Sequence, residues 1–174
     1  MKLSLSAIIF GLALLVAGCS TTRHDASEIF GGPGSTRVLE LPDAVRAWRL
    51  DSSYAGAQPC EAEPDGYPAL DGPVAVDGWE GQRLGGLLAQ PGSYSWGGAA
   101  KACLPRYGVR LEFERDGSTL DALLCFGCEL LLAYKDRAYA GAGDFRPARG
   151  ELARSMLELF PEFEELEQFL APGE

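Results

Sequence analysis

The residues of this chain whose types and spacing could do chemistry are its cysteines, above all the pair in Cys125-Phe126-Gly127-Cys128. A C-x-x-C pair acts as a redox dithiol when its first cysteine caps a helix, because that position favours the thiolate. Together with Cys60 and Cys103, the pair could instead supply the four thiolates of a zinc site. In a third interpretation the cysteines are structural and form disulfides. The elements that carry these residues decide among the three.

The stretch from Val109 to Tyr134 predicts the core of the fold. Its first part alternates apolar and charged residues, which is typical of a half-buried strand. Asp116-Gly117 then supplies the two positive-φ positions of a tight hairpin turn. The returning strand, Leu120 to Phe126, is apolar at nearly every residue, as expected of a central strand covered on both faces. The sequence therefore predicts a central β-hairpin.

The turn also fixes the register of this hairpin. If Asp116-Gly117 is a two-residue loop, Arg115 faces Ser118 across the strands. Val109 then faces Leu124, which places apolar residues opposite each other. This agreement between turn and pattern supports the register.

The register suggests how the cysteines pair. Cys103 lies one diagonal step from Cys128 on the same face, and a bulge near Gly127 would bring the two within disulfide reach. Cys125 is expected to point to the other side of the sheet. Cys103–Cys128 is thus the favoured bridge, and Cys60 and Cys125 remain as the possible second pair.

Two separate arguments count against the redox dithiol and the zinc site. Cys125 and Cys128 are three residues apart, and in an extended strand that separation is about 10 Å, beyond the reach of a disulfide. A zinc site needs thiolates, which an oxidising compartment tends to remove. We therefore expect no metal and no cofactor.

The N-terminus reads as an export signal. Lys2 is followed by an apolar, uncharged run from Leu3 to Val16, which is short for a transmembrane helix of about 20 residues. Val16-Ala17-Gly18-Cys19 resembles the lipobox of bacterial lipoproteins, with an aliphatic residue, two small residues and a cysteine. The alternative is an uncleaved signal anchor with an incidental cysteine.

The resemblance implies that residues 1–18 are a signal peptide and that Cys19 becomes the lipidated N-terminus, carrying palmitate or similar acyl chains. Two or three acyl chains anchor a protein to a bilayer almost permanently. Ser20 is not the aspartate that favours inner-membrane retention in such proteins, so we expect the periplasmic face of the outer membrane. The membrane is the first partner that the sequence predicts.

Residues 19–36 are expected to form a flexible tether, because they contain Gly31-Gly32-Pro33-Gly34 and few apolar residues. The only histidine of the chain, His24, lies in this tether. The folded domain, residues 37–174, should therefore contain neither a Ser-His-Asp triad nor a histidine-ligated metal.

The remaining pattern predicts an α+β domain, with an antiparallel sheet on the hairpin and C-terminal helices packed on one face. Val38 to Leu41 is a short apolar run typical of a strand. Asp77 to Gln90 reads as a helix capped by Asp77, and an apolar stripe after Phe145 predicts a C-terminal helix broken at Pro161.

Charge and motifs narrow the function. The net charge is −10, which repels phosphate backbones, so nucleic acid is not expected as a partner. The sequence contains no Gly-x-Ser-x-Gly elbow, phosphate loop or His-Glu zinc motif. This favours a non-enzymatic envelope lipoprotein that binds a protein partner or has a structural role. The alternative is a periplasmic thiol-disulfide enzyme or a cysteine-ligated zinc protein.

A second resemblance covers residues 103–160. The segment Cys103-Leu104-Pro105-Arg106-Tyr107-Gly108-Val109-Arg110, followed by Cys125-Phe126-Gly127-Cys128, resembles a group of small uncharacterised bacterial lipoproteins. These share a C-x-P-x-(H/Y)-G strand, a hairpin and a C-F-x-C segment ahead of a C-terminal helix. The resemblance implies no activity, and Cys60 is not clearly part of the shared pattern.

Overall fold

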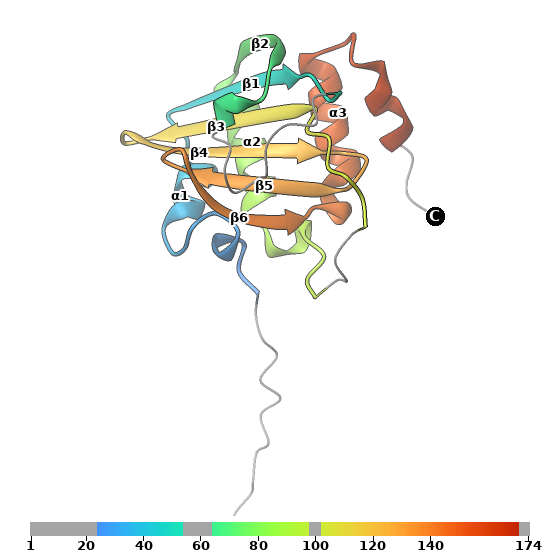
Figure 1. Cartoon of the computed structure of the whole chain (residues 1–174). Coiled ribbons are helices and arrows are strands. Elements are labelled where there is room, and N and C mark those ends of the chain that lie inside the picture. The colour runs from blue at the N-terminus through green and yellow to red at the C-terminus, as the bar shows by residue number, and fades with distance from the viewer. Residues whose placement is uncertain (1–23, 54–63, 98–101, 171–174) are drawn as a thin grey trace, which may run out of the picture.

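The computed structural model describes residues 24–53, 64–97 and 102–170. Over these residues the chain forms a mixed α+β fold with one six-stranded antiparallel sheet (Figure 1). The strand order is β2-β1-β3-β4-β5-β6, so β1 and β3 are the only neighbours that are not consecutive in the sequence. The strands are β1 (Ala44–Leu50), β2 (Ala69–Val76), β3 (Val109–Arg115), β4 (Ser118–Cys125), β5 (Leu130–Lys135) and β6 (Ala138–Asp144).

The helices within the described residues are mostly short. The α-helices are α1 (Ser35–Glu40), α2 (Gly78–Ala89) and α3 (Arg149–Leu159). The 3-10 helices are η1 (Ala26–Glu28), η2 (Pro64–Gly66), η3 (Pro91–Ser93), η4 (Arg146–Ala148) and η5 (Glu164–Phe169). Helix α3 ends just before Pro161, where the sequence predicts a break, and the chain continues into η5.

Strands β3 and β4 form the central hairpin in the predicted register. Arg115 pairs with Ser118, and Val109 pairs with Leu124. Asp116 and Gly117 have φ values of 51° and 78°, the left-handed conformation that a two-residue hairpin turn requires. The Asp-Gly dipeptide thus fixes which residues of both strands face the helices.

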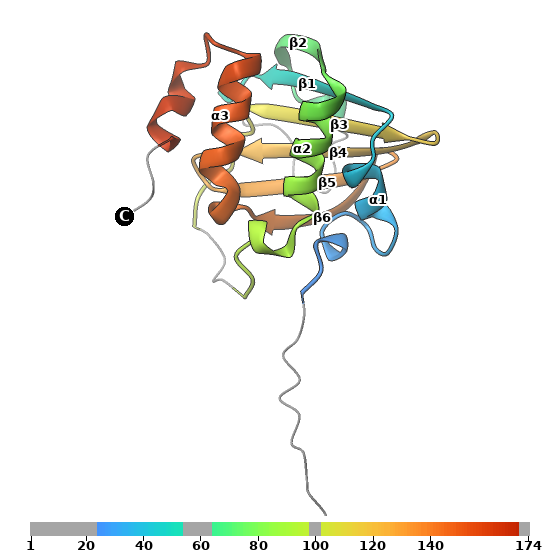
Figure 2. The same cartoon turned by 180° about the vertical axis from the view of Figure 1, so that it is seen from behind.

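One face of the sheet is covered by α2 and α3, which lie across it in Figure 2. The main apolar core lies between this face and the helices. Strands β3 and β4 contribute Leu111, Phe113 and Leu124, and α3 contributes Leu152 and Met156, all of them fully buried. Burial of apolar side chains on this face supplies most of the stabilisation of the domain.

The run Val38 to Leu41 is not a strand. Val38 and Leu39 are buried side chains of α1, which begins after Gly34 in the left-handed conformation at φ 92°. Four residues are too few to distinguish the period of a strand from that of a helical turn, and here tertiary packing selects the helix.

The prediction that residues 19–36 form a flexible tether is wrong for residues 25–36. Asp25 caps η1 by accepting a hydrogen bond from the N–H of Ser27 at 2.8 Å, and Ala26, Ile29 and Phe30 are buried in the main core. This packing depends on Gly141 of β6, where a Cβ would lie 2.6 Å from the Ile29 carbonyl oxygen. The described fold therefore begins near residue 24 and not at residue 37, and residues 1–23 lie outside the described part.

The opposite face of the sheet carries a buried ion pair. Arg110 Nε donates to Asp121 Oδ1 at 2.7 Å, although Arg110 is only 8% exposed and Asp121 only 1%. The same guanidinium donates to Glu112 at 2.8 Å and lies 4.4 Å from the ring centroid of Trp48. These contacts satisfy charges that would be costly to bury alone.

Candidate functional site: an apolar pocket beside three cysteines

Cys103 and Cys128 lie together, as the sequence predicts. Their Cα atoms are 6.1 Å apart, and their side chains meet at a distance compatible with a disulfide bond. Cys103 belongs to the exposed segment that precedes β3, and Cys128 lies in the turn that follows β4. The pair thus joins that segment to the end of the sheet.

Cys125 is the last residue of β4 and is only 2% exposed. Its Sγ accepts a hydrogen bond from the backbone N–H of Arg106 at 3.1 Å, which fixes the direction of the side chain. No cysteine of the described residues is bonded to it. Cys60 and Cys19 lie outside the described residues, so the Cys60–Cys125 pair and the lipidation of Cys19 stay predictions.

The C-x-x-C segment does not lie on an extended strand. Residues 126–129 form the turn between β4 and β5, and Glu129 has a positive φ of 55°. Cys125 and Cys128 also belong to one small apolar cluster on the face opposite the helices, so the expectation that Cys125 points away from Cys128 is wrong. Because the chain turns after Cys125, the 10 Å separation of an extended strand does not apply.

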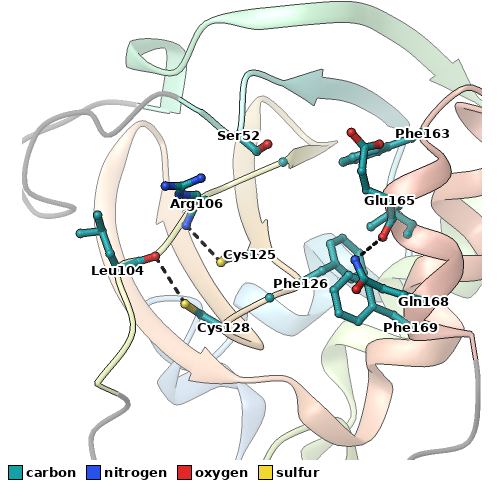
Figure 3. Close-up of a pocket in the computed structure, with 13 residues that line it drawn as sticks. Ser52, Leu104, Arg106, Cys125, Phe126, Cys128, Phe163, Glu165, Gln168 and Phe169 are labelled. Carbon is teal, nitrogen blue, oxygen red and sulfur yellow. Dashed lines mark hydrogen bonds between the residues drawn. The ribbon is translucent and has the colours of Figure 1, made fainter.

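A pocket of about 240 Å³ lies at this end of the sheet (Figure 3). Its walls come from Ser52, two residues after β1, from the segment before β3, from the end of β4 with the β4–β5 turn, and from η5 with Phe163 just before it. The apolar side chains that line it are Leu104, Phe126, Phe163, Leu166 and Phe169. The end of β4 and the turn after it add Cys125, Gly127 and Cys128 to the lining. Four segments that are distant in the sequence thus enclose one apolar space.

The aromatic side chains of this pocket are held by ring contacts. The rings of Phe126 and Phe169 are stacked with centroids 6.0 Å apart, and Phe126 meets Phe145 edge to face at 5.5 Å. The side chain of Arg149 lies over Phe169, with its guanidinium carbon 5.2 Å from the ring centroid. These contacts fix the η5 wall relative to the turn.

Polar side chains also line the pocket. They are Ser52, Arg106, Glu165 and Gln168. Figure 3 shows Arg106 on the side of the two cysteines, and Glu165 on the η5 side. The Arg106 side chain is exposed, and within the described residues no carboxylate pairs with it. The pocket therefore combines an apolar interior with one available cation.

The only histidine, His24, is not part of a free tether. Its ring is stacked on that of Trp96, with centroids 4.6 Å apart and planes 4° from parallel. It is not among the residues that line the pocket beside Cys125. Across residues 24–53, 64–97 and 102–170, no group of three or more histidine, cysteine or acidic side chains could hold a metal ion.

Sequence reasoning found the cysteines of this site but not the pocket. Phe163 and Leu166 belong to the apolar stripe after Phe145, and they pack into the core while also lining the pocket. Ser52 and Arg106 carry no pattern that marks them, because a pocket between distant segments has no sequence period.

The comparisons with known proteins add no assignment. No family model, curated protein or solved structure matches this chain. No helix of the described residues is both long and apolar enough to span a bilayer.

Proposed function

We propose that this protein is a lipid-anchored envelope protein that binds a small amphipathic anion without converting it. The observation that carries the proposal is the apolar pocket with Arg106 at its edge. The ligand has an aromatic or branched apolar body that enters the pocket and an acidic group that stays near Arg106.

The size and lining of the pocket support this ligand class. An apolar cavity of about 150 Å³ is enough to bind benzene. At about 240 Å³ the pocket has room for a ring and a short substituent. Apolar walls with few polar groups are typical of small-molecule sites, in which the polar groups orient the ligand.

The charge of the site supports an acidic ligand. The Arg106 side chain is exposed and pairs with no carboxylate of the described residues, so its positive charge is available to an acidic group in the pocket. Glu165 lies on the η5 side of the pocket and disfavours an anion there, which directs the acidic group toward Arg106.

The lipid anchor remains part of the proposal, on the outer membrane facing the periplasm. Since the described fold begins near Asp25, five residues, 20–24, lie between it and Cys19. Even fully extended, the chain from Cys19 to Asp25 spans only about 20 Å. The domain would then stay close to the lipid headgroups and would not reach far into the periplasm.

The Cys103–Cys128 contact supports a structural disulfide as part of the proposed binding function. A bridge at that position would hold Leu104 and Arg106 in place as one wall of the pocket. An oxidising periplasm would favour the bond.

The test uses phenylacetate, which has one aromatic ring and one anionic group, and the full chain. We expect isothermal titration calorimetry to detect one binding site per chain. Arg106→Gln should weaken binding by about two- to fivefold, the effect of one exposed charge. Arg154→Gln is the matched control, because Arg154 is an exposed arginine of α3 that does not line the pocket.

A second variant tests the pocket itself. Gly127 lines it, and a Cβ there meets no atom within 4 Å, so Gly127→Val should narrow the pocket without disturbing the core. Binding should fall while the melting temperature stays the same. Equal binding by wild type, Arg106→Gln and Gly127→Val would contradict the proposal.

A thiol-disulfide activity is the second candidate. The observation that favours it is the turn at residues 126–129, which removes the geometric objection to a bond between Cys125 and Cys128. A redox activity would require these two cysteines to cycle between thiols and a disulfide with an outside partner.

A further inference from the structure

Three cysteines of the described chain lie at one end of the sheet. Cys103 and Cys128 are close enough to bond, and Cys125 and Cys128 lie in the same apolar cluster and on the same pocket wall. Figure 3 shows the sulfur atoms of Cys125 and Cys128 on the side of the pocket formed by Leu104 and Arg106. Cys128 thus lies against Cys103 and shares its cluster with Cys125, and it can bond only one of them at a time.

Backbone geometry allows either bond. The Cα atoms of Cys103 and Cys128 are 6.1 Å apart, within the range of disulfides. Cys125 ends β4 and Cys128 lies in the 126–129 turn that follows, so the two are closer than the roughly 10 Å that an extended strand would impose. Disulfides span about 4.4–6.8 Å between Cα atoms, and the turn is the segment that would adjust to bring Cys125 and Cys128 into that range.

We propose that Cys125 is the attacking thiol of an internal thiol-disulfide exchange with the Cys103–Cys128 bridge. The Cys125 thiolate attacks Sγ of Cys128. The Cys125–Cys128 bond forms as the Cys103–Cys128 bond breaks, and Cys103 leaves as the thiolate. The proton lost by Cys125 returns through solvent to Cys103. One disulfide and one thiol exist before and after the step, so it requires no oxidant or reductant.

The exchange moves a thiol from the interior to the surface. Cys125 is buried, whereas Cys103 is exposed and lies in a segment without helix or strand. A Cys103 thiolate can attack a disulfide of another molecule and form a mixed disulfide with it, releasing one thiolate of that molecule. The site is thus a thiol-transfer site for disulfide-containing partners, with Cys103 as the exposed nucleophile.

The exchange also acts on the pocket. Leu104 and Arg106 follow Cys103 directly and form one pocket wall. The Cys103–Cys128 bridge fixes the start of this segment, and its release removes that link at Cys103. The proposal is independent of the ligand proposed above, since it concerns the cysteines alone, and either proposal can fail without the other.

The test uses the full chain with Cys60→Ser and an aromatic disulfide reagent, 5,5′-dithiobis(2-nitrobenzoate), under native conditions. Peptide mapping without reduction then locates the label and the remaining bridge, with Cys19 followed as a separate peptide. We expect the label on Cys103 and a new Cys125–Cys128 bond. Labelling of Cys103 should accelerate as pH rises, since only the thiolate attacks.

Matched variants separate exchange from direct labelling. Cys125→Ser should abolish labelling of Cys103, because nothing displaces it from Cys128. Cys103→Ser should acquire a Cys125–Cys128 bond in a glutathione redox buffer, whereas Cys128→Ser should form no bond between Cys103 and Cys125.

Three results would overturn the proposal. The first is label on Cys125 with the Cys103–Cys128 bond intact. The second is labelling of Cys103 that persists in Cys125→Ser. The third is a Cys60–Cys125 bond in the native wild-type chain, which would leave Cys125 without a thiol to attack.

Discussion

Gly85 of α2 lies directly against the Leu39 carbonyl of α1, so that a Cβ at Gly85 would stand 1.8 Å from that oxygen. Real Cβ atoms do not approach so closely, and the contact involves backbone on both sides. The glycine that lowers the intrinsic helix propensity of α2 is therefore what lets α1 pack onto it.

This contact predicts opposite effects at two adjacent glycines. Gly85→Ala should destabilise the domain by about 1–3 kcal/mol or more, because the helices must separate. Gly86→Ala is the matched control, since a Cβ there meets no atom within 4 Å, and it should raise stability by up to about 1 kcal/mol. Urea denaturation of both variants measures the difference. Equal stability of the two would show that α1 and α2 are not in this contact.

The buried ion pair predicts a large effect of a small change. Asp121→Asn removes the charge opposite Arg110 while preserving the size of the side chain. Arg110 then keeps Glu112 but loses the buried carboxylate, which should cost about 1–3 kcal/mol in the free energy of unfolding. Asp116→Asn, at a side chain that is 79% exposed, should change it little. A loss at Asp121 no larger than that at Asp116 would mean that Arg110 reaches solvent.

The Glu80–Arg83 pair predicts a pH dependence. The hydrogen bond from Arg83 lowers the pKa of Glu80 from its usual range. A carboxyl with a lowered folded-state pKa stabilises the fold above its unfolded pKa, and this contribution is lost as pH falls through the folded value. The stability difference between wild type and Glu80→Gln should therefore be present at neutral pH and disappear in acid. Denaturation curves from pH 7 to pH 3 test this, and a difference that persists unchanged at low pH would contradict it.

The Cys103–Cys128 contact predicts a stabilising bridge. The two cysteines are 25 residues apart in the sequence, and closing a loop of that length should stabilise by about 3–4 kcal/mol on the chain-entropy model. Cys103→Ala should lower the free energy of unfolding by that amount under oxidising conditions. Under reducing conditions the wild type and the variant should become alike. A difference that survives reduction would show that packing, and not a bridge, is responsible.

The lipobox predicts a modified N-terminus. Mass spectrometry of the membrane-extracted protein should find residues 1–18 removed and acyl chains on Cys19. Cys19→Ala should leave unprocessed precursor or a soluble form. An unmodified Cys19 in mature wild-type protein would remove the anchor from the proposed function and leave the pocket as its only support.

Several features could be predicted from the sequence because neighbouring residues determine them. The Asp116-Gly117 turn and the alternation around it set the register of β3 and β4. Asp77 caps α2 by accepting hydrogen bonds from Trp79 and Glu80. In each case the signal and the structure lie within a few residues of each other, so local stereochemistry is sufficient.

The edge strands and the first turns of the fold were decided only by tertiary structure. Strand β6 is rich in alanine and glycine and has no apolar period, yet Gly141 and Gly143 leave the space into which Ile29 packs. Because the sequence does not reveal this space, residues 25–36 have the pattern of a flexible segment, although their apolar side chains complete the core. A glycine adds nothing to a hydrophobic pattern, so the sequence does not show which element will pack against it.

The pocket and the grouping of three cysteines at one end of the sheet also depend on packing between segments that are distant in the sequence. The hairpin register brings Cys103 near Cys128, but the turn after Cys125 reverses the chain and places all three sulfur atoms at one end of the sheet. Segments separated by up to about a hundred residues then close around them. The sequence by itself determined the hairpin and one cysteine pair, because their spacing is local. Only the packing of the η5 segment and the Arg106 segment against the turn created a space that a ligand can enter.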